Sequence, residues 1–388
     1  MISPKKTVSV VLWTAFILGF TIFLIVFNTT LDYPRPADTQ SGNHYEKAQV
    51  TKIVSDTLAP DPDFPEIQIG IQELELKILT GEQKGKPILA KNFVGRVDNK
   101  PAKVGTKMIV SSYDGFVSAM VVNYSREFPI YILALLFFGL VIFFGRKKGL
   151  KSIFSLVFSL ISIVFLFIPM LIRGVNPVTA SIVVVILSTA VTLLSLNGWC
   201  KKTIVAGISC IACTFGAGAI AMIIGAITHI STYTTPEAEH MIFIAQSTSL
   251  KLHDILFAGI IIAASGAMMD TTMSIASALW EMLEINPKLT GKQLFTSGMN
   301  IGRDVMGTMT NTLILAFTGS SINALMMIFM YDMPYMQTVN LELLIVEIIK
   351  GLSGSIAVVL AIPVTALLCA KFYGQGGNKM QGRRIAKH

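Results

Sequence analysis

Long apolar runs dominate the sequence and alternate with short polar segments. The first run, Val8 to Phe27, has about the 20 residues that a helix needs to cross a hydrocarbon core. After Pro129 the chain is almost continuously apolar, and the pattern predicts further spans at about 130–145, 150–172, 176–197, 202–228, 254–282, 299–330 and 342–371. The sequence therefore predicts a polytopic α-helical membrane protein with about eight transmembrane helices.

The first run follows Lys5 and Lys6, and no small-residue cleavage motif comes after it. Signal-peptide cores have about 7–15 apolar residues, so residues 1–28 are interpreted as a retained transmembrane anchor. A cleaved signal peptide is the alternative interpretation.

Between the anchor and the next span, residues 29–128 have a different pattern, with charges of both signs and short alternating stretches. Ile67–Ile71 alternates with one phase and Leu74–Ile78 with the other, and the change at Gln72-Glu73 predicts a β-bulge. This period of two predicts β-strands rather than helices.

Two hairpins are predicted in the same region. Gly81–Gly85 has the composition of a hairpin loop, and Tyr113-Asp114-Gly115 lies between the strand-like stretches Met108–Val110 and Phe116–Val122. Leu31–Gln49, which is rich in Pro, Asp and Gly, is predicted to be a linker. Five to seven short strands predict a small β-barrel or sandwich domain.

Two segments of the apolar half depart from simple spans. The polar, amphipathic stretch His229–Asp254 is predicted to lie on the membrane surface as a helix. The run 299–330 is too long for one straight span, and Gly319-Ser320-Ser321 is predicted to interrupt it. The apolar stretch Ala324–Met330 would then form a half-span.

Composition supports the membrane class, since 53% of the 388 residues are hydrophobic and 14% are charged, against about 25% charged in soluble proteins. The basic residues that flank the apolar runs fall on alternate connections: Lys5, Lys6, Arg146, Lys147, Lys148, Lys151, Lys201, Lys202, Lys288, Lys292, Lys371, Lys379, Arg383, Arg384 and Lys387. The opposite connections have only Arg173 and Lys251 in their short loops. The positive-inside rule predicts a multi-pass protein of the cell membrane with both termini cytoplasmic and the β domain outside.

The same asymmetry explains the net charge of +8 by topology, so the lipid bilayer and not nucleic acid is the predicted partner of the basic residues. The domains predicted are the anchor 1–28, the extracytoplasmic β domain 29–128, the helical domain 129–373 and a basic cytoplasmic tail 374–388. The four cysteines all lie in or beside apolar spans, and Cys210 and Cys213 of the CxxC are interpreted as packing residues.

The strongest candidate for chemistry is Asp270, deep in the span 254–282. A charge at the centre of a bilayer costs about 2.5–3.5 kcal/mol on insertion scales, so such a residue needs a partner, water or a task. Thr271, Thr272 and Ser274 are its neighbours in sequence. We expect these hydroxyls to gather around the carboxyl group.

The next span opens with a polar stripe. At helical spacing Asn300, Arg303 or Asp304, Thr308, and Asn311 or Thr312 fall on one face. Because successive spans are antiparallel neighbours, we expect Asp270 to meet this face near the middle of the membrane.

A proton or ion relay is the functional interpretation of this cluster. Asp270 would be the titrating group, Arg303 and Asp304 would tune its charge, and Thr308 and Asn311 would pass a proton or bind a cation through water. The structural interpretation is a polar cluster whose hydrogen bonds fix helix packing.

The remaining polar candidates are weaker. Glu347 and Lys350 lie one helical turn apart and are expected to pair with each other. No nucleotide-binding loop, zinc-protease motif, serine-hydrolase elbow or dinucleotide fingerprint occurs in the sequence, so no enzymatic activity, cofactor or metal site is predicted.

The stretches Gly266-Ala267-Met268-Met269-Asp270 and Asn300-Ile301-Gly302-Arg303-Asp304, together with Gly307–Leu313, resemble the YibE/F family of bacterial multi-spanning proteins. The resemblance extends from Gly145 to about Tyr373. The β domain behind one anchor is similar to the longer, YibE-like members, which implies a shorter YibF-like membrane partner, with a homo-oligomer as the alternative. The resemblance implies no established activity.

The order of anchor, outer domain and helical block is also similar to the SecD/SecF branch of the resistance-nodulation-division transporters, which use proton flow. On that likeness Asp270 and Asp304 would correspond to intramembrane carboxylates of that branch, although more spans precede Asp270 and the outer domain is smaller. The expected function is a membrane transporter or export-assisting subunit coupled to a proton or ion gradient. The alternative is a non-transporting scaffold whose outer β domain recruits a partner.

Overall fold

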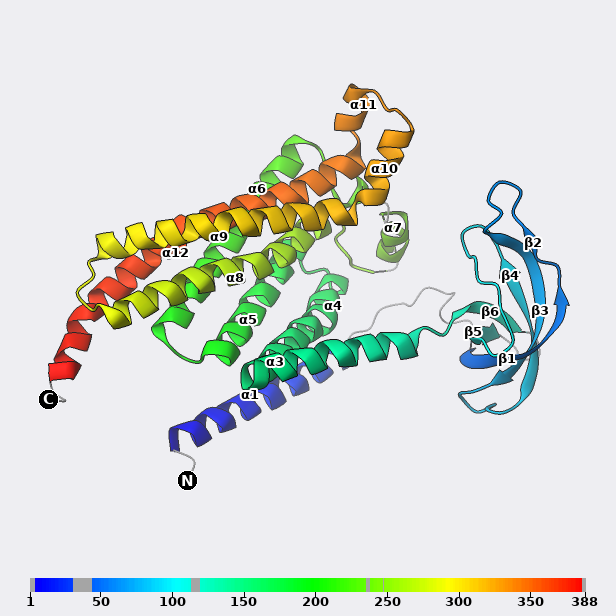
Figure 1. The fold of residues 1–388 in the computed structure, drawn as a ribbon, viewed down its shortest axis with the longest axis horizontal. Coiled ribbons are helices and arrows are strands. Elements are labelled where there is room, and N and C mark those ends of the chain that lie inside the picture. Colours follow the sequence, from blue (N-terminus) through cyan, green and yellow to red (C-terminus); the bar gives the residue numbers. More distant parts are fainter. Residues whose placement is uncertain (1–3, 31–43, 113–118, 235–237, 247, 386–388) are drawn as a thin grey trace. The chain divides into compact units, whose positions relative to one another are not determined.

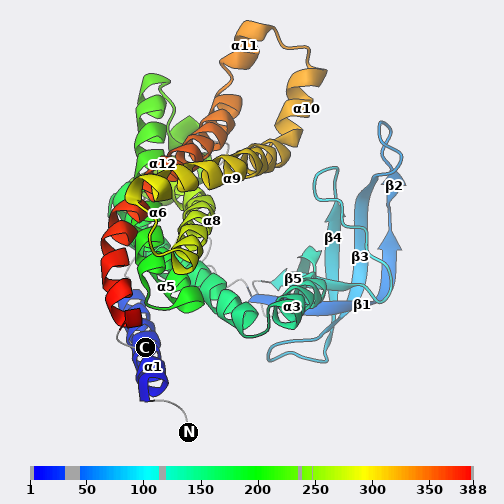
Figure 2. The same cartoon turned by 60° about the vertical axis from the view of Figure 1, so that its left-hand side comes forward.

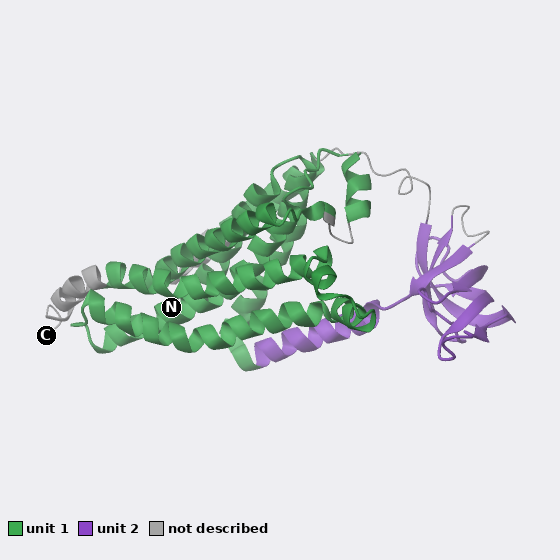
Figure 3. Ribbon diagram, turned by 90° about the horizontal axis from the view of Figure 1, so that it is seen from above, with its two compact units in different colours: residues 1–34, 144–388 green, residues 35–143 purple. Residues whose placement is uncertain are grey.

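The computed structural model describes residues 4–30, 44–112, 119–234, 238–246 and 248–385. The chain forms two compact units, which Figure 3 shows in two colours. One unit, residues 35–143, contains the β domain, and the other, residues 1–34 and 144–388, contains a helical bundle.

The β domain is a closed barrel. Its strands are β1 (His44–Asp56), β2 (Ala59–Pro60), β3 (Gln68–Ile78), β4 (Pro87–Val94), β5 (Lys107–Ser112) and β6 (Ala119–Tyr124). They hydrogen-bond in the order β1-β5-β6-β4-β3, and a β1–β3 pairing closes the ring, with the short β2 added beside β3. Among the described strands β4 and β6 pair in parallel, and the other pairs are antiparallel. Of the two predicted architectures, the barrel is therefore the one that forms, and its strand order is that of the OB fold.

Alternating side chains fill the interior of the barrel. Leu74, Leu76 and Ile78 of β3 are fully buried, and they pack with Met108 and Val110 of β5. The residues between them point outward, as the period of two requires. The predicted strand character of this region is confirmed.

The predicted β-bulge at Gln72-Glu73 is wrong. The β3–β4 register runs without a shift from Gly70 to Lys77, and the irregularities lie in β1, on either side of Ile53. Gln72 points into the barrel, so the inward phase is continuous, and Ile71 is exposed instead. A buried glutamine is tolerated because its amide hydrogen-bonds to Asp56 (3.1 Å) and to the Ala102 backbone (3.2 and 2.8 Å).

The loop Gly81–Gly85 joins β3 to β4 as predicted, and both glycines have positive φ, 72° and 92°. The second predicted loop, Tyr113–Gly115, lies outside the described residues, but the strands that flank it pair antiparallel. The predicted linker was too long, since its last part, His44–Gln49, is the start of β1 and hydrogen-bonds with β5.

The remaining elements are helical. Their bounds are α1 (Pro4–Thr29), α3 (Glu127–Ser162), η1 (Ile163–Phe167), α4 (Ile168–Ile172), α5 (Pro177–Asn197), α6 (Lys201–Ile227), η2 (Thr232–Thr234), α7 (Ala238–Gln246), α8 (Ile255–Ile285), α9 (Gly291–Ser320), α10 (Ile322–Met330), α11 (Tyr335–Val339) and α12 (Glu342–Ile385). Within the described residues, 5 helical segments are long and apolar enough to span a membrane, or 6 when α9 and α10 count as one bent span. The chain is a multi-pass membrane protein, with fewer qualifying segments than the eight predicted.

Two features account for the difference in span count. The continuous segment Glu127–Ile172 has 46 residues, whereas 130–145 and 150–172 were predicted as separate spans. It is broken at Arg146, where φ is 48° and ψ is −128°, and a straight helix of that length would be about 69 Å long. The anchor region is helical, but its described apolar part, Ala15–Thr29, is shorter than a full span.

Helix α8 lies at the centre of the bundle and packs against α5, α6, α9 and α12. Helices α9 and α12 lie side by side along most of their length (Figures 1 and 2). Helix α9 begins at Gly291, eight residues before the predicted span, with a capping box between Thr290 and Gln293. It ends at Ser320 and turns by 61° into α10, which confirms the predicted interruption.

The segment predicted as a surface helix, His229–Asp254, is helical only in part. Helix α7 covers its middle and a short turn precedes it. Asp254 instead accepts a hydrogen bond from the side chain of Asn176 (3.1 Å). This contact fastens the start of α8 to the start of α5.

Candidate functional site

Asp270 is the central residue of the 31-residue helix α8. It lies on the exposed side of that helix, together with Gly259, Ala263, Gly266 and Ser274, at successive spacings of three or four residues. No hydrogen bond or ion pair of Asp270 occurs among the described residues. The carboxyl group therefore lies at the middle of the helix without a hydrogen-bond or ion-pair partner in the described part of its own chain.

The two threonines next to Asp270 do not gather around it. Thr271 and Thr272 are fully buried on the opposite side of α8, whereas Asp270 is exposed. Their hydroxyls donate to carbonyls of their own helix, Ala267 at 2.9 Å and Met269 at 3.3 Å. Because successive residues on a helix are about 100° apart, neighbours in sequence can face opposite sides. The expected cluster around Asp270 is thus wrong for these two residues.

Helix α9 presents the predicted polar stripe on its exposed side. Arg303, Asp304, Thr308 and Asn311 are all exposed there. The guanidinium of Arg303 donates to the side-chain oxygen of Asn300 at 3.1 Å. Since α9 has 30 residues from Gly291, Arg303 and Asp304 lie within one turn of its midpoint. Both residues therefore lie deeper in the span than they would if the span began at residue 299.

Glycines on the other side of α9 fix its orientation. A Cβ at Gly298 would lie 2.8 Å from the Cβ of Ala366, and one at Gly302 would lie 2.1 Å from Cγ2 of Ile362. These glycines let α9 pack closely against α12. A Cβ at Gly307, on the polar side, would meet no atom within 4 Å. The packing that holds α9 in place therefore turns the stripe away from α12.

The hydroxyls of the stripe bond to their own helix. Thr308 donates to the carbonyl of Val305 at 2.9 Å, and Thr312 donates to the carbonyl of Thr308 at 2.8 Å. In the described part of the chain, the side chains of Asp304 and Asn311 make no hydrogen bond. The carboxyl group of Asp304 and the amide of Asn311 are thus the polar groups of the stripe without a hydrogen-bond partner among the described residues, and the structure gives no contact between them and Asp270.

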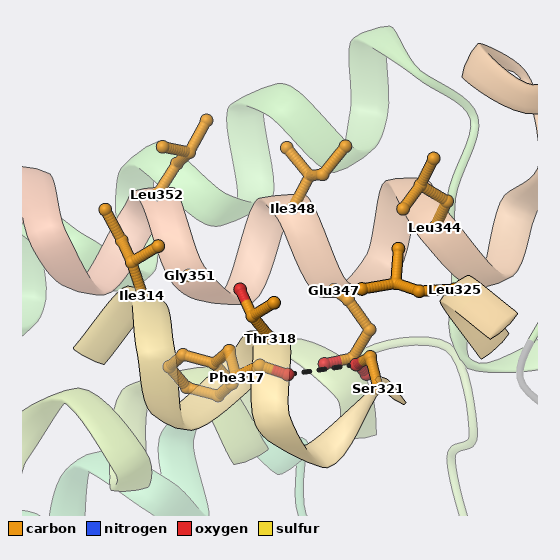
Figure 4. Close-up of a pocket in the computed structure, with 10 residues that line it drawn as sticks. All are labelled: Ile314, Phe317, Thr318, Ser321, Leu325, Leu344, Glu347, Ile348, Gly351 and Leu352. Carbon is orange, nitrogen blue, oxygen red and sulfur yellow. Dashed lines mark hydrogen bonds between the residues drawn. The ribbon is translucent and has the colours of Figure 1, made fainter. Parts of the chain in front are cut away.

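One cavity lies where α9, α10 and α12 meet, and a second lies beside α8, between η2, α7, α9 and α12. The first, of about 320 Å³, is drawn in Figure 4 and is lined by Ile314, Phe317, Thr318, Ser321, Leu325, Leu344, Glu347, Ile348, Gly351 and Leu352. The Ser321 hydroxyl donates to the Phe317 carbonyl at 3.0 Å beside it. The second, of about 450 Å³, is lined by Thr232, Met241, Ile255, Leu256, Gly259, Ile260, Ala263, Phe317 and Lys350. Phe317 lines both cavities.

An ion pair connects the two cavities. Glu347 lines the first, Lys350 lines the second, and their side chains pair at 2.7 Å, which confirms the predicted pairing. The side chains are 19% and 30% exposed, in surroundings that are otherwise almost entirely apolar. The pair therefore provides the only charged lining among the described residues of these two cavities.

A family model described as YibE/F-like protein matches residues 133–375. This match covers more than half of the chain. The chain belongs to the YibE/F-like family. The matched region contains α8, α9 and most of α12, and it begins after the last strand of the barrel.

No curated protein and no solved structure matches this chain. The likeness to the SecD/SecF branch finds no support in the comparisons. Membership in the YibE/F-like family therefore gives no role to the site residues of this chain. Their interpretation depends on the geometry of the structure.

Sequence reasoning did not single out Phe317 or the cavities beside it. Phe317 lies in an apolar stretch, and a Cβ at Gly351 would lie 3.8 Å from two of its side-chain atoms. A phenylalanine in α9 and a glycine in α12 are separated by more than thirty residues, so only the fold shows that they meet. The acidic and basic positions of this YibE/F-like chain were visible in the sequence because charges are rare in spans.

Proposed function

We propose that this YibE/F-like chain couples an ion gradient, with protons as the first candidate, to transport or to assistance of export across the cell membrane. Both termini would be cytoplasmic and the barrel would lie outside. Asp270 is the titrating group, and Arg303, Asp304, Thr308 and Asn311 form the relay. No enzymatic step is part of the proposal.

The observation that carries this proposal is Asp270, an acid at the centre of a spanning helix with no partner from its own chain in the described part. A structural role would require hydrogen bonds that stabilise packing, because an unpaired carboxylate in hydrocarbon costs several kcal/mol. An acid that must accept and release a proton needs access to water or to a second group instead. The lack of fixed bonds supports the titrating role over the structural one.

The cavity beside Lys350 supports a route toward Asp270. Gly259 and Ala263 line this cavity, and the same side of α8 continues through Gly266 to Asp270 at helical spacing. The small side chains leave room along this side, and a Cβ at Gly266 would meet no atom within 4 Å. Water along this side of α8 would bring protons from the cavity to the carboxyl group.

The test is proton flux into proteoliposomes that enclose a pH-sensitive dye and carry an imposed potassium diffusion potential. The wild-type chain should acidify or alkalinise the lumen as the sign of the potential dictates, and Asp270→Asn should abolish the flux, because the amide cannot ionise. Glu281→Gln is the matched control, since Glu281 is exposed on the same helix near its end. Equal flux in the wild type and Asp270→Asn would contradict the proposal.

A second candidate, a scaffold that recruits a partner through the barrel, is favoured by one observation. Ile71 and Phe93 are directly paired on the outside of β3 and β4 and are 41% and 45% exposed, with Leu89 and Met120 close by in the register. Exposed apolar groups of this kind often mark interaction sites. If removal of the barrel abolishes a cellular phenotype that Asp270→Asn leaves intact, this second function holds.

A further inference from the structure

The exposed side of α9 carries Arg303, Asp304, Thr308 and Asn311 in the middle part of the helix, and this set is here called the mid-span polar face. Thr308 bonds within its helix and Arg303 donates to Asn300, whereas Asp304 and Asn311 have no side-chain hydrogen-bond partner in the described part of the chain. The mid-span polar face differs from the exposed residues of α6, such as Ile208, Phe215 and Ile223, which are large and apolar.

Covering this face with lipid has a high free-energy cost. Each carboxylate at mid-membrane costs about 2.5–3.5 kcal/mol on insertion scales, and the amide of Asn311 would leave donors and an acceptor unpaired. Apolar side chains such as Phe215 meet lipid without cost. The surface of the bundle thus divides into sides suited to lipid and one side suited to a polar partner.

The charges on this face are arranged so that the face of one copy is complementary to the same face of a second copy. Arg303 and Asp304 are adjacent in sequence and close to the midpoint of α9, but they point about 100° apart, and Arg303 bonds to Asn300 rather than to Asp304. A two-fold axis along the membrane normal would place equal depths opposite each other. Arg303 of each copy would then meet Asp304 of the other, and the two Asn311 amides, each with donors and an acceptor, could bond to each other.

We propose that a second copy of this chain covers the mid-span polar face, with α9 against α9 across a two-fold axis. The open space at Gly307 allows the close approach that such a contact needs, because a Cβ there would meet no atom within 4 Å. The relay would then be completed by residues of both copies. This proposal depends on the membrane-spanning character of α9 and does not require proton coupling.

The first test is disulfide cross-linking in native membranes. All four native cysteines, Cys200, Cys210, Cys213 and Cys369, are replaced by alanine, and a single cysteine is introduced by Asn311→Cys. Oxidation should give a covalent dimer of twice the chain mass. Phe215→Cys is the control, because Phe215 is 44% exposed near the middle of α6 on a side suited to lipid.

The second test exchanges the charges. Arg303→Asp alone and Asp304→Arg alone should each lose the cross-link, since like charges would face each other across the axis. Co-expression of the two variants under different tags should restore it, and only between unlike chains, because one then carries two acids and the other two bases. Restoration also shows that both variants fold.

The proposal is overturned if Asn311→Cys cross-links no more than Phe215→Cys. It is also overturned if the product joins the chain to a different protein, or if the co-expressed charge variants fail to pair. A dimer with no proton flux would leave this proposal standing and contradict only the proposed function, so the two can fail separately.

Discussion

Two side-chain amides, one in the barrel and one in the helical bundle, have opposite surroundings. In the barrel, the amide of Gln72 is buried and bonds to Asp56, Asn92 and the Ala102 backbone. In the bundle, the amide of Asn311 is exposed at mid-span and has no partner among the described residues. The first arrangement is that of a structural group, and the second is the one that we propose serves a proton or another chain.

The cost of an exposed polar side chain depends on whether water or hydrocarbon surrounds it. Exposed Glu73 and Lys91 on the barrel face each other across β3 and β4 and can be hydrated by water. Equal exposure of Asp270 in a spanning helix is costly, because hydrocarbon offers no hydrogen bonds. An exposed polar residue is therefore ordinary in one unit and is evidence of function in the other.

The largest difference in stability between the two units is expected when each of the two amides is replaced by alanine. Gln72→Ala should lower the free energy of unfolding of the barrel by about 2–4 kcal/mol, since it leaves buried groups unpaired and opens a cavity. Asn311→Ala should change the stability of the detergent-solubilised chain by no more than about 0.5 kcal/mol. Urea titration with proteolysis of each unit measures both. Equal losses at the two positions would contradict the assignment of Asn311 to an interface or relay.

Alanine substitutions at two glycines of α9 compare the side that packs against α12 with the polar side. Gly302→Ala should destabilise the bundle by about 1–3 kcal/mol, because the new Cβ would overlap Ile362. Gly307→Ala should stabilise the solubilised chain by up to about 1 kcal/mol, because the space there is open and alanine favours the helix. Thermal unfolding in detergent distinguishes them. A loss at Gly307 as large as that at Gly302 would place the polar stripe inside the bundle.

The smallest expected effect concerns a charge cluster of the barrel. Arg96 donates to Asp61 at 2.5 and 2.9 Å and to Asp63 at 2.5 Å, and its guanidinium lowers the pKa of the Asp61 carboxyl. A depressed pKa in the folded state gives stability that is present above the unfolded pKa of about 4 and is lost as the pH falls through the folded value.

The wild-type barrel should therefore lose stability on acidification below about pH 4, and Arg96→Gln should make this loss less steep. Lys86→Gln removes the same charge from an exposed position and serves as the control. Unfolding midpoints of the intact protein at a series of acidic pH values measure the slopes. Identical slopes in wild type and Arg96→Gln would show that this cluster does not contribute to acid sensitivity.

The sequence predicted β3, β5 and β6 from short strand-like stretches and their hairpin loops, but it took the start of β1 for a linker. The closure of the barrel was not predictable in the same way. The parallel β4–β6 pairing joins segments without a local turn, and the inward position of Gln72 depends on partners far away in sequence. Long-range hydrogen bonds, rather than local pattern, fix both features.

In the bundle, Asp270, Arg303 and Asp304 stand out in the sequence alone because charges are rare in apolar spans, whereas their surroundings follow only from the fold. Hydropathy placed the start of α9 too late, although Thr290 and Gln293 give a capping-box signal. The directions of Thr271 and Thr272 follow from the packing of α8 against four helices, which sequence adjacency does not show.

The most direct test of the central claim, that Asp270 is a working acid, is infrared titration of its carboxyl group in the purified protein in lipid. The difference between spectra of wild type and Asp270→Asn isolates the band of a protonated carboxylic acid at this position. We predict that this band appears and disappears reversibly as the pH is changed over the physiological range. A band that stays constant, whether present or absent, would contradict energy coupling through Asp270.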